Sequence, residues 1–298
     1  MSPCFGTYVF IEKPQTNAPN EGAWTGKPER KKPYINGLKG CQGKDFRAPN
    51  RCCDEYTSPV SVPVESKEPS RVKAMFGEIS RRYDLLNHIL SLNLDVGWRR
   101  RAARAACPVA GQRVLDLCGG TGDLSAALAE GSKPASLVVC CDFSRPMLAR
   151  AAPKFLRSGL DDRCFVIEGD ALRLPFREGS FDAVTVGFGV RNLADMHAGF
   201  REILRVLSPG GRLVVLEFSR PSGPLLKRIY GFYLRAIVPL LGDGASGRRG
   251  PYVYLARTIG DFPEPDLLAG MIRDAGFAAV GWESLTGGIV CVHTALKA

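Results

Sequence analysis

A glycine-rich turn follows a short apolar run near the middle of the sequence. Val114–Cys118 leads into the residues Gly119, Gly120, Thr121, Gly122 and Asp123. Glycines allow a tight turn and the close approach of a ligand to the backbone. The pattern is not the dinucleotide motif GxGxxG, because Ser125 stands where its last glycine is required. Asp123 would repel a pyrophosphate but suits a cationic ligand. A strand–turn–helix without a ligand is the alternative interpretation.

Acidic residues also follow the next two apolar runs. Asp142 ends the second run, where a carboxylate can accept hydrogen bonds from both ribose hydroxyls. Its alternative role is a charge at the start of a helix. Asp170 and Ala171 follow the third run, where Asp170 would hold an adenine amino group beside apolar neighbours; a solvated turn is the alternative. Three such ends on successive strands predict S-adenosyl-L-methionine as the cofactor.

A fourth apolar run ends in Gly187, Phe188 and Gly189, followed by Arg191 and Asn192. An arginine beside an amide can bind and polarise an oxygenated aromatic ring. We therefore expect this segment to face the substrate. The alternative is that Arg191 only pairs with Asp123 or with a surface carboxylate.

The elements that position these residues alternate along the chain. We expect strands at Arg113–Cys118, Ser136–Cys141, Cys164–Glu168, Phe181–Val186 and Arg212–Phe218. Helices are expected at Glu68–Asp84, Trp98–Cys107, Asp123–Glu130, Ser144–Ser158 (capped by Ser144), Met196–Leu207 and Glu264–Ala275. Phe277–Ser284 and Gly288–Leu296 read as two strands joined by Leu285–Gly287, an antiparallel hairpin. This order predicts an α/β fold: the Rossmann-like, doubly wound parallel sheet of a class I methyltransferase, ending in that hairpin.

The two ends of the 298-residue chain differ in character. Residues 1–66 are rich in Pro, Gly, Asn, Lys and Arg and lack a helical or strand period, which predicts a disordered or targeting extension. Glu12, Glu21 and Glu29 disfavour an organellar transit peptide, and translation starting near Met75 is a further alternative. Residues 67–298 are expected to form the methyltransferase domain. Within it, residues 220–258 form an insertion that acts as a lid or faces a membrane.

The bulk composition narrows the classes of partner. The formal net charge of +10 suits nucleic acid or an anionic membrane, but no nucleic-acid-binding signature accompanies it, so we expect no nucleic acid partner. No apolar run reaches the length of about 18 residues that a membrane-spanning helix needs. The ten cysteines include no CxxC pair, which favours reduced thiols and predicts no metal site.

Two further motifs resemble a known family. Tyr83–Ser91, continuing to Asp95 and Trp98, and Arg205–Gly211, continuing to Glu217 and Ser219, resemble the signatures of the UbiE/MenG quinone C-methyltransferases. The resemblance spans roughly residues 70–298. The chain departs from the family pattern twice. Asp95 stands where many members have histidine, and Gly187 stands where some have a serine that contacts the cofactor. Any contact from residue 187 is therefore expected through its backbone.

The resemblance implies methylation of a ring carbon of a polyprenyl quinol, with S-adenosyl-L-methionine as the donor. We expect demethylmenaquinol as the acceptor, in menaquinone biosynthesis. The alternatives are a 2-methoxy-6-polyprenyl-1,4-benzoquinol of ubiquinone biosynthesis, or a catalytically silent scaffold in a quinone-biosynthetic complex. By resemblance, the quinol oxygen, or a water that takes its proton, is oriented by Arg191, Asn192 and Asp123. The substrate pocket would be closed by Tyr83, Asp84, Asn87 and Phe188, although the first three suit a helix-anchoring role equally well.

A polyprenylated quinol resides in a membrane, so the resemblance also implies peripheral membrane contact. We expect a cytoplasmic protein at the inner face of the membrane, or an organellar one if the extension is a transit peptide. Basic and apolar residues interleave over Lys227–Arg235, which suits an interfacial helix; a lid helix or a dimer contact is the alternative. A homodimer or a quinone-biosynthetic complex is left open.

Overall fold

The computed structural model describes residues 68–80, 83–106, 111–131, 136–221, 223–238 and 251–298. The chain divides into two compact units, Met1–Arg51 and Cys52–Ala298, and all described residues belong to the second. The predictions for the extension, residues 1–66, and for part of the insertion lie outside the described residues. No helix within the described ranges combines the length and the apolar character that crossing a bilayer requires.

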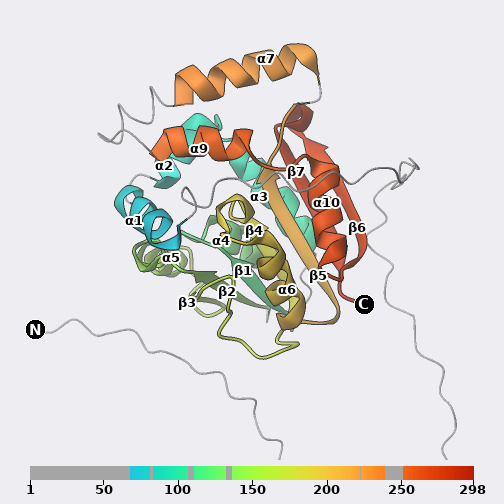
Figure 1. Ribbon diagram of the computed structural model, residues 1–298. Helices are drawn as coiled ribbons and strands as arrows, with labels where there is room; N and C mark the ends of the chain where they lie inside the picture. The colour runs from blue at the N-terminus through green and yellow to red at the C-terminus, as the bar shows by residue number, and fades with distance from the viewer. Residues whose placement is uncertain (1–67, 81–82, 107–110, 132–135, 222, 239–250) are drawn as a thin grey trace, which may run out of the picture. The chain divides into compact units, whose positions relative to one another are not determined.

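Seven strands form one sheet in the order β3-β2-β1-β4-β5-β7-β6 (Figure 1). Their bounds are β1 Arg113–Leu117, β2 Leu137–Asp142, β3 Cys164–Glu168, β4 Phe181–Gly187, β5 Leu207–Phe218, β6 Ala278–Leu285 and β7 Val290–Leu296. The first five strands are parallel, and β7 runs antiparallel to both β5 and β6. The predicted doubly wound sheet and its terminal hairpin are confirmed. Because the chain reverses its direction of growth between β1 and β4, ligands are expected at the carboxyl ends of those strands.

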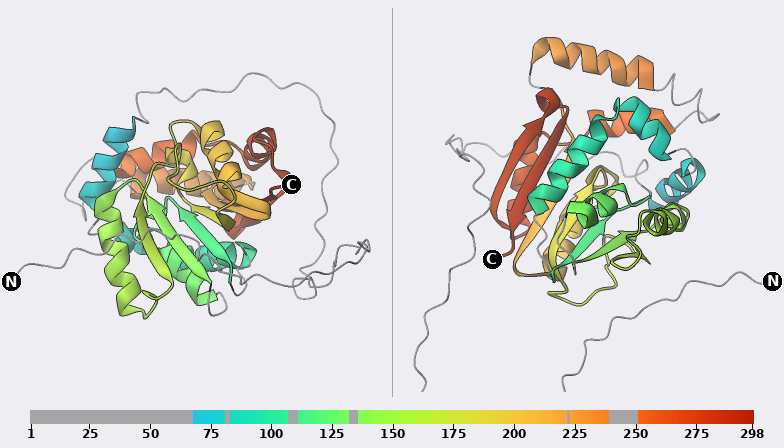
Figure 2. Two further views of the ribbon diagram at one scale, coloured as in Figure 1. Left: turned by 90° about the horizontal axis from the view of Figure 1, so that it is seen from below. Right: turned by 180° about the vertical axis from the view of Figure 1, so that it is seen from behind.

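Two hydrophobic layers cover the faces of the sheet. One face packs against α3 Leu94–Ala106, α4 Asp123–Gly131 and α5 Arg145–Arg157, and the other against α6 Met196–Val206 and α10 Pro265–Asp274 (Figures 1 and 2). Successive residues of β1 serve opposite layers: Val114 belongs to the first, and Leu115 and Leu117 to the second. This alternation follows from the two-residue period of a strand, and it fixes the direction in which β1 enters the glycine turn.

The remaining helices lie beyond the carboxyl ends of the strands (Figure 1). They are α1 Pro69–Ile79, α2 Tyr83–Leu90, α7 Pro224–Phe232, the π-helical turn η3 Tyr233–Ile237 and α9 Pro251–Gly260. Two 3₁₀ turns, η2 Val190–Asn192 and η4 Thr286–Gly288, complete the described elements.

Several predicted boundaries are wrong. The expected helix Glu68–Asp84 is two helices, because α1 ends at Ile79 and α2 begins at Tyr83. The helix predicted from Trp98 begins at Leu94. Strand β5 begins at Leu207 instead of the expected Arg212, so Ser208–Gly211 lies inside a strand, whose register with β4 is irregular there. Gly210 takes a φ of 74° there, which lets the chain bend before the ladder resumes at Arg212.

The prediction that the Ser144 side chain caps α5 is also wrong. Ser144 occupies the N-cap position, but its hydroxyl makes no capping hydrogen bond. The backbone N–H of Ser144 instead donates to Oδ1 of Asp142 at 2.8 Å. The start of α5 is therefore tied to the acidic residue that ends β2.

Candidate functional site

A cavity of about 80 Å³ lies at the carboxyl ends of β1 to β4. The predicted cofactor residues that line it are Gly120, Asp142, Asp170, Ala171 and Gly187, together with the substrate-facing residue Asn192. They come from four strand ends that the topology brings to one edge of the sheet. The tertiary structure thus places these separated motifs around one space.

The glycine turn has a backbone that side chains would distort. Cys118 and Gly120 both take a φ of 56°, and Gly122 one of 84°. A Cβ on Gly119 would lie 2.6 Å from Sγ of Cys140, and one on Gly122 would lie 2.6 Å from the ring of Phe155. Gly119 and Gly122 are therefore required by the packing behind the turn, while Gly120 lines the cavity itself.

Thr121 was predicted to contact the cofactor, but it faces another partner. Its hydroxyl donates to Oδ1 of Asp84 in α2, and Thr121 does not line the cavity. The threonine therefore joins the turn to α2.

Asp142 is the best-defined polar group of this cavity. Only 7% of the residue is exposed. Its Oδ2 accepts from the backbone N–H of Gly120 at 3.0 Å, and its Oδ1 accepts from that of Ser144 at 2.8 Å. Burial raises the pKa of this carboxyl to about 6, although the backbone hydrogen bonds that it accepts act to lower that pKa. A carboxylate has about four acceptor sites, so Asp142 keeps acceptor capacity for ribose hydroxyls beside its backbone hydrogen bonds.

Asp170 is exposed and stabilises its own turn. Its Oδ1 accepts from the backbone N–H of Leu172 at 2.9 Å. The apolar residues Ala171, Leu172 and Phe143 line the cavity beside it, as a planar ring requires. Gly187 lies across the cavity, and a Cβ there would come within 2.9 Å of Leu124. The residues that line the cavity therefore fit a nucleoside ligand, with the glycine backbone of Gly187 on one side of it.

A second cavity, of about 290 Å³, adjoins the first. Its wall is largely aromatic and aliphatic and comes from α1, α2, α3, α7, η3 and α9 and from the ends of β4 and β5. Phe76, Tyr83 and Phe188 line both cavities. We call these the donor cavity (about 80 Å³) and the acceptor cavity (about 290 Å³). Two ligands bound in them would meet at these three rings.

Arg191 is buried in the wall of the acceptor cavity. Its side chain is 5% exposed, and NH1 donates to Oε1 of Glu217 at 2.7 Å and to the carbonyl of Phe188. The guanidinium also lies over the ring of Phe218, 5.4 Å from its centroid. The alternative expectation, a pair with Asp123 or a surface carboxylate, is wrong. Sequence reasoning missed Glu217 as the partner, although it lies within the second family signature.

Asn192 lies on the other side of the same 3₁₀ turn and lines the donor cavity, whereas Arg191 lines the acceptor cavity. The hydroxyl of Tyr254, from α9, donates to Oδ1 of Asn192 at 3.2 Å. This bond leaves the amide NH₂ of Asn192 as a donor. Arg191 and Asn192 are therefore adjacent in the sequence but line different cavities.

Asp123 belongs to an ion-pair network and lines neither of these two cavities. Lys154 of α5 contacts Asp123 and lies 2.8 Å from Oδ2 of Asp84. Arg99 approaches Asp123 from α3 at 3.7 Å. The structure therefore does not bring Asp123 together with Arg191 and Asn192. Sequence reasoning also missed Lys154, because nothing in the helical pattern of α5 distinguishes it.

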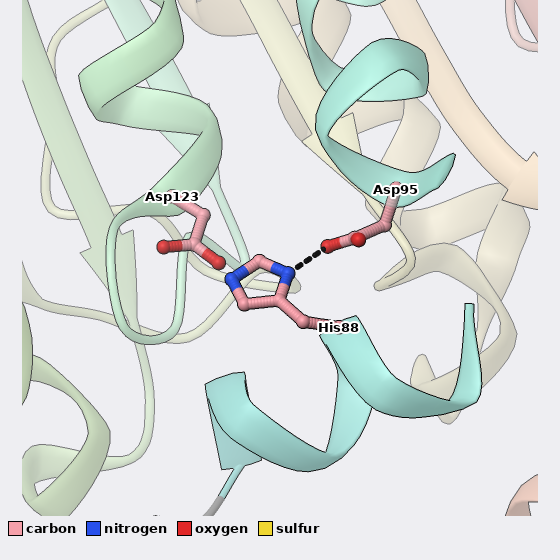
Figure 3. A group of neighbouring side chains, drawn as sticks. All are labelled: His88, Asp95 and Asp123. Carbon is pink, nitrogen blue, oxygen red and sulfur yellow. Dashed lines mark hydrogen bonds and ion pairs between the residues drawn. The ribbon is translucent and has the colours of Figure 1, made fainter. Parts of the chain in front are cut away.

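His88, Asp95 and Asp123 come together beside this network (Figure 3). Their ligand atoms lie within 4.8 Å of one another, a spacing that a metal ion would accept. His88 Nδ1 is 2.8 Å from Oδ2 of Asp95, and Ser91 donates to Oδ1 of Asp95 at 2.6 Å.

Cations of the protein already neutralise both carboxylates. Arg99 is hydrogen-bonded to Asp95 and lies near Asp123. Burial of Asp95 acts to raise its pKa, but hydrogen bonds from Ser91 and His88 and the charge of Arg99 hold the pKa below its ordinary value. We therefore interpret the group as an ion-pair network that joins α2, α3 and α4.

Tyr83 lies at the junction of the two cavities, between the edge-on ring of Phe76 and the side chain of Asn87. Burial raises the pKa of its phenol, so the hydroxyl stays protonated near neutral pH. Asp84, its neighbour, points away to Thr121 and Lys154. Of the four predicted pocket residues, Tyr83, Asn87 and Phe188 line the acceptor cavity and Asp84 anchors α2.

Known proteins resemble this chain over almost all of its described part. A demethylmenaquinone methyltransferase of Thermus thermophilus is 48% identical over 219 residues, which are 74% of this chain and 98% of the relative. One of Beutenbergia cavernae is 46% identical over 231 residues, covering 78% and 92%.

Solved structures share the fold at low sequence identity. The [4+2]-cyclase SpnF has a TM-score of 0.56 at 19% identity and covers 76% of this chain and 94% of its own. A SAM-dependent methyltransferase of Thermotoga maritima has a TM-score of 0.52 at 19% identity, covering 75% and 100%. Residues 64–297 match the profile of the ubiE/COQ5 methyltransferase family. The family predicted from the two signatures is thus confirmed, and the chain belongs to the ubiE/COQ5 methyltransferase family.

Proposed function

We propose that this protein transfers a methyl group from S-adenosyl-L-methionine to a ring carbon of demethylmenaquinol, giving menaquinol. One observation carries the proposal: a cavity that carries Asp142 and Asp170 at two strand ends adjoins a larger apolar cavity, and three aromatic residues line both. A methyl donor and an apolar acceptor ring would meet there. Relatives named demethylmenaquinone methyltransferase, 42–48% identical over most of their length, support this acceptor.

The donor cavity would hold the cofactor by its nucleoside. Asp142 keeps acceptor capacity for the ribose hydroxyls, and Asp170 lies beside the apolar residues that would flank the adenine. Gly120 and Gly187 line this cavity with backbone alone, and the methionine portion would lie against them. When bound, S-adenosyl-L-methionine supplies an electrophilic methyl group on a sulfonium.

The acceptor cavity would exclude water from the reacting ring. Its aromatic walls include Trp98, Phe188 and Phe218, with ring centroids 4.6 to 6.3 Å apart. Alignment of two bound reactants in a dry site supplies much of the rate enhancement of such a transfer. The aliphatic part of the wall, from α7, η3 and α9, suits the start of a polyprenyl tail.

Deprotonation of the quinol makes the adjacent ring carbon nucleophilic and leaves negative charge on oxygen. Arg191, fixed by Glu217, stands in the cavity wall as a permanent positive charge. Its Nε is buried and has no hydrogen-bond partner among the described residues. The positive charge of this guanidinium would stabilise the quinol oxygen, or orient a water that accepts its proton. Tyr83 keeps its own proton and would donate at the cavity junction.

The test is a reconstituted reaction of the full chain with S-adenosyl-L-methionine and chemically reduced quinones. Demethylmenaquinol should gain one methyl group, seen by mass spectrometry, and the rate should exceed that on a 2-methoxy-6-polyprenyl-1,4-benzoquinol. Faster methylation of the benzoquinol would replace the proposed acceptor. Binding of S-adenosylhomocysteine without any methylation would instead favour a silent scaffold.

We further propose that the protein works at the inner face of the membrane, on the cytoplasmic side, because its substrate carries a polyprenyl tail. Fractionation of cells that express the tagged full chain tests this placement, including the organellar alternative. The homodimer and the quinone-biosynthetic complex stay predictions, which light scattering and affinity purification test.

A further inference from the structure

Large apolar side chains are exposed mainly in two segments. Of the ten such residues in the described ranges, seven belong either to α7 or to the segment formed by α2, the turn after it and the first residue of α3. They are Leu85, Ile89, Leu92, Leu94, Leu225, Ile229 and Phe232, which we call the apolar rim. Clustering of this kind differs from the scattered exposed leucines of an ordinary surface.

The two segments are neighbours although they are far apart in sequence. The hydroxyl of Tyr233 donates to the carbonyl of Leu90, and Leu86 packs in a small cluster with Val238 and Leu234. Figure 1 shows α7 and α2 at the same end of the fold.

The apolar rim adjoins the acceptor cavity. Leu92, Leu94 and Ile229 are exposed to solvent and also line that cavity. An apolar cavity with an apolar rim offers a continuous path for a hydrocarbon chain from the surface to the reacting ring.

The turn after α2 holds one leucine outward in an unfavourable conformation. Leu92 has a φ of 53° and Asn93 one of 61°, the left-handed region that leucine rarely adopts. Leu92 as a residue is 82% exposed. Backbone hydrogen bonds from Leu92 to Ile89 and from Asn93 to His88 hold this turn, and it presents Leu92 to the surroundings of the described chain.

Positive charge accompanies the apolar rim on α7 and η3. Lys227, Arg228 and Arg235 are exposed there, between the apolar positions. From Arg220 to Gly242 the sequence contains no Asp or Glu. Such a segment is complementary to a bilayer with acidic lipids, which has anionic headgroups at its surface and apolar acyl chains beneath them.

We propose that the apolar rim docks the protein on an anionic lipid bilayer, with Lys227, Arg228 and Arg235 at the headgroup phosphates and the acceptor cavity opening toward the acyl chains. The inference deepens the proposed function, since it rests on an acceptor that resides in the membrane. The sequence pointed only to residues 220–258 for this contact. The structure adds α2 and the turn after it, from the opposite end of the domain sequence.

Vesicle co-sedimentation of the full chain tests this surface. The variant Leu85→Ser/Phe232→Ser changes one exposed residue in each segment, and neither residue lines a cavity. Its binding to phosphatidylcholine vesicles containing phosphatidylglycerol should fall at least about tenfold, because the variant lacks two of the apolar side chains that would insert into the bilayer. Leu156→Ser, an equally exposed leucine on α5, is the matched control and should bind as the wild type does.

A charge variant separates the two contributions. Lys227→Gln/Arg228→Gln should lose several-fold of its binding to anionic vesicles and little of its weaker binding to pure phosphatidylcholine. Unchanged sedimentation of both double variants would overturn the proposal. So would a wild-type dimer in light scattering that Leu85→Ser/Phe232→Ser dissociates, because a second copy would then cover the rim.

Activity distinguishes failure of the docking surface from failure of the proposed function. With a short-tailed quinol in detergent, Leu85→Ser/Phe232→Ser should retain wild-type turnover, which also shows that it folds. Turnover without vesicle binding by the wild type would refute the docking surface alone. Vesicle binding without quinol methylation would refute the proposed function and, with it, the need of the enzyme to reach a membrane-embedded acceptor.

Discussion

The buried pair of Arg191 and Glu217 offers the sharpest test of how the acceptor cavity is built. Glu217 is 1% exposed in its side chain, and its Oε1 accepts from NH1 of Arg191 at 2.7 Å and from the backbone N–H of Phe218 at 3.0 Å. The substitution Glu217→Gln keeps the shape and one backbone bond but removes the negative charge. It leaves the guanidinium buried without a counterion.

The expected cost follows from that burial. Removing one partner of a buried ion pair destabilises a protein by about 3–5 kcal/mol, because the remaining charge stays desolvated. For a domain of this size that cost corresponds to a fall in Tm of roughly 10 °C. Glu217 lines neither the donor nor the acceptor cavity. Affinity for S-adenosylhomocysteine should therefore change little, while kcat falls because Arg191 loses the group that orients it.

Urea unfolding followed by circular dichroism measures the stability change. Arg191→Met and the double variant complete a double-mutant cycle. The double variant should lose at least about 2 kcal/mol less than the sum of the single variants, since neither charge is then left alone. A cost below about 1 kcal/mol for Glu217→Gln, or additive single costs, would refute the assignment of Glu217 as the buried partner of Arg191.

Three further predictions concern the donor cavity and its supports. Gly189→Ala would place a Cβ 2.4 Å from that of Cys118 and should cost about 1–3 kcal/mol in urea unfolding, whereas Gly97→Ala in open space on α3 should stabilise by up to about 1 kcal/mol. Because burial raises the pKa of Asp142 to about 6, its protonation below that pH removes an acceptor. Calorimetric affinity for S-adenosylhomocysteine should therefore fall as the pH drops through about 6, and Asp142→Asn should bind weakly at every pH. Lys154→Met leaves two carboxylates facing each other and should lower Tm; an unchanged melting curve would show that the network is dispensable.

Local features of the sequence predicted much of the donor cavity. Apolar runs with a turn or an acidic residue at their ends marked β1 to β4, and parallel topology forces those ends to one edge of the sheet. Gly120, Asp142, Asp170 and Gly187 could therefore be assigned to one site before their distances were known. The hairpin β6–β7 was recognisable for a similar reason, since the turn signal and both strands are contiguous.

The partners of long charged side chains depended on the tertiary structure. Arg191 follows β4 and pairs with Glu217 on the neighbouring strand β5. Lys154 lies between a carboxylate from α2 and one from α4. No periodic pattern in the sequence predicts either ion pair, because a flexible side chain pairs with whichever charge the packing of other elements brings within reach. The strand ends of the donor cavity are fixed by backbone hydrogen bonding that each segment's own sequence specifies. The acceptor cavity has no such local signature, because its wall forms only when helices from both ends of the domain pack together.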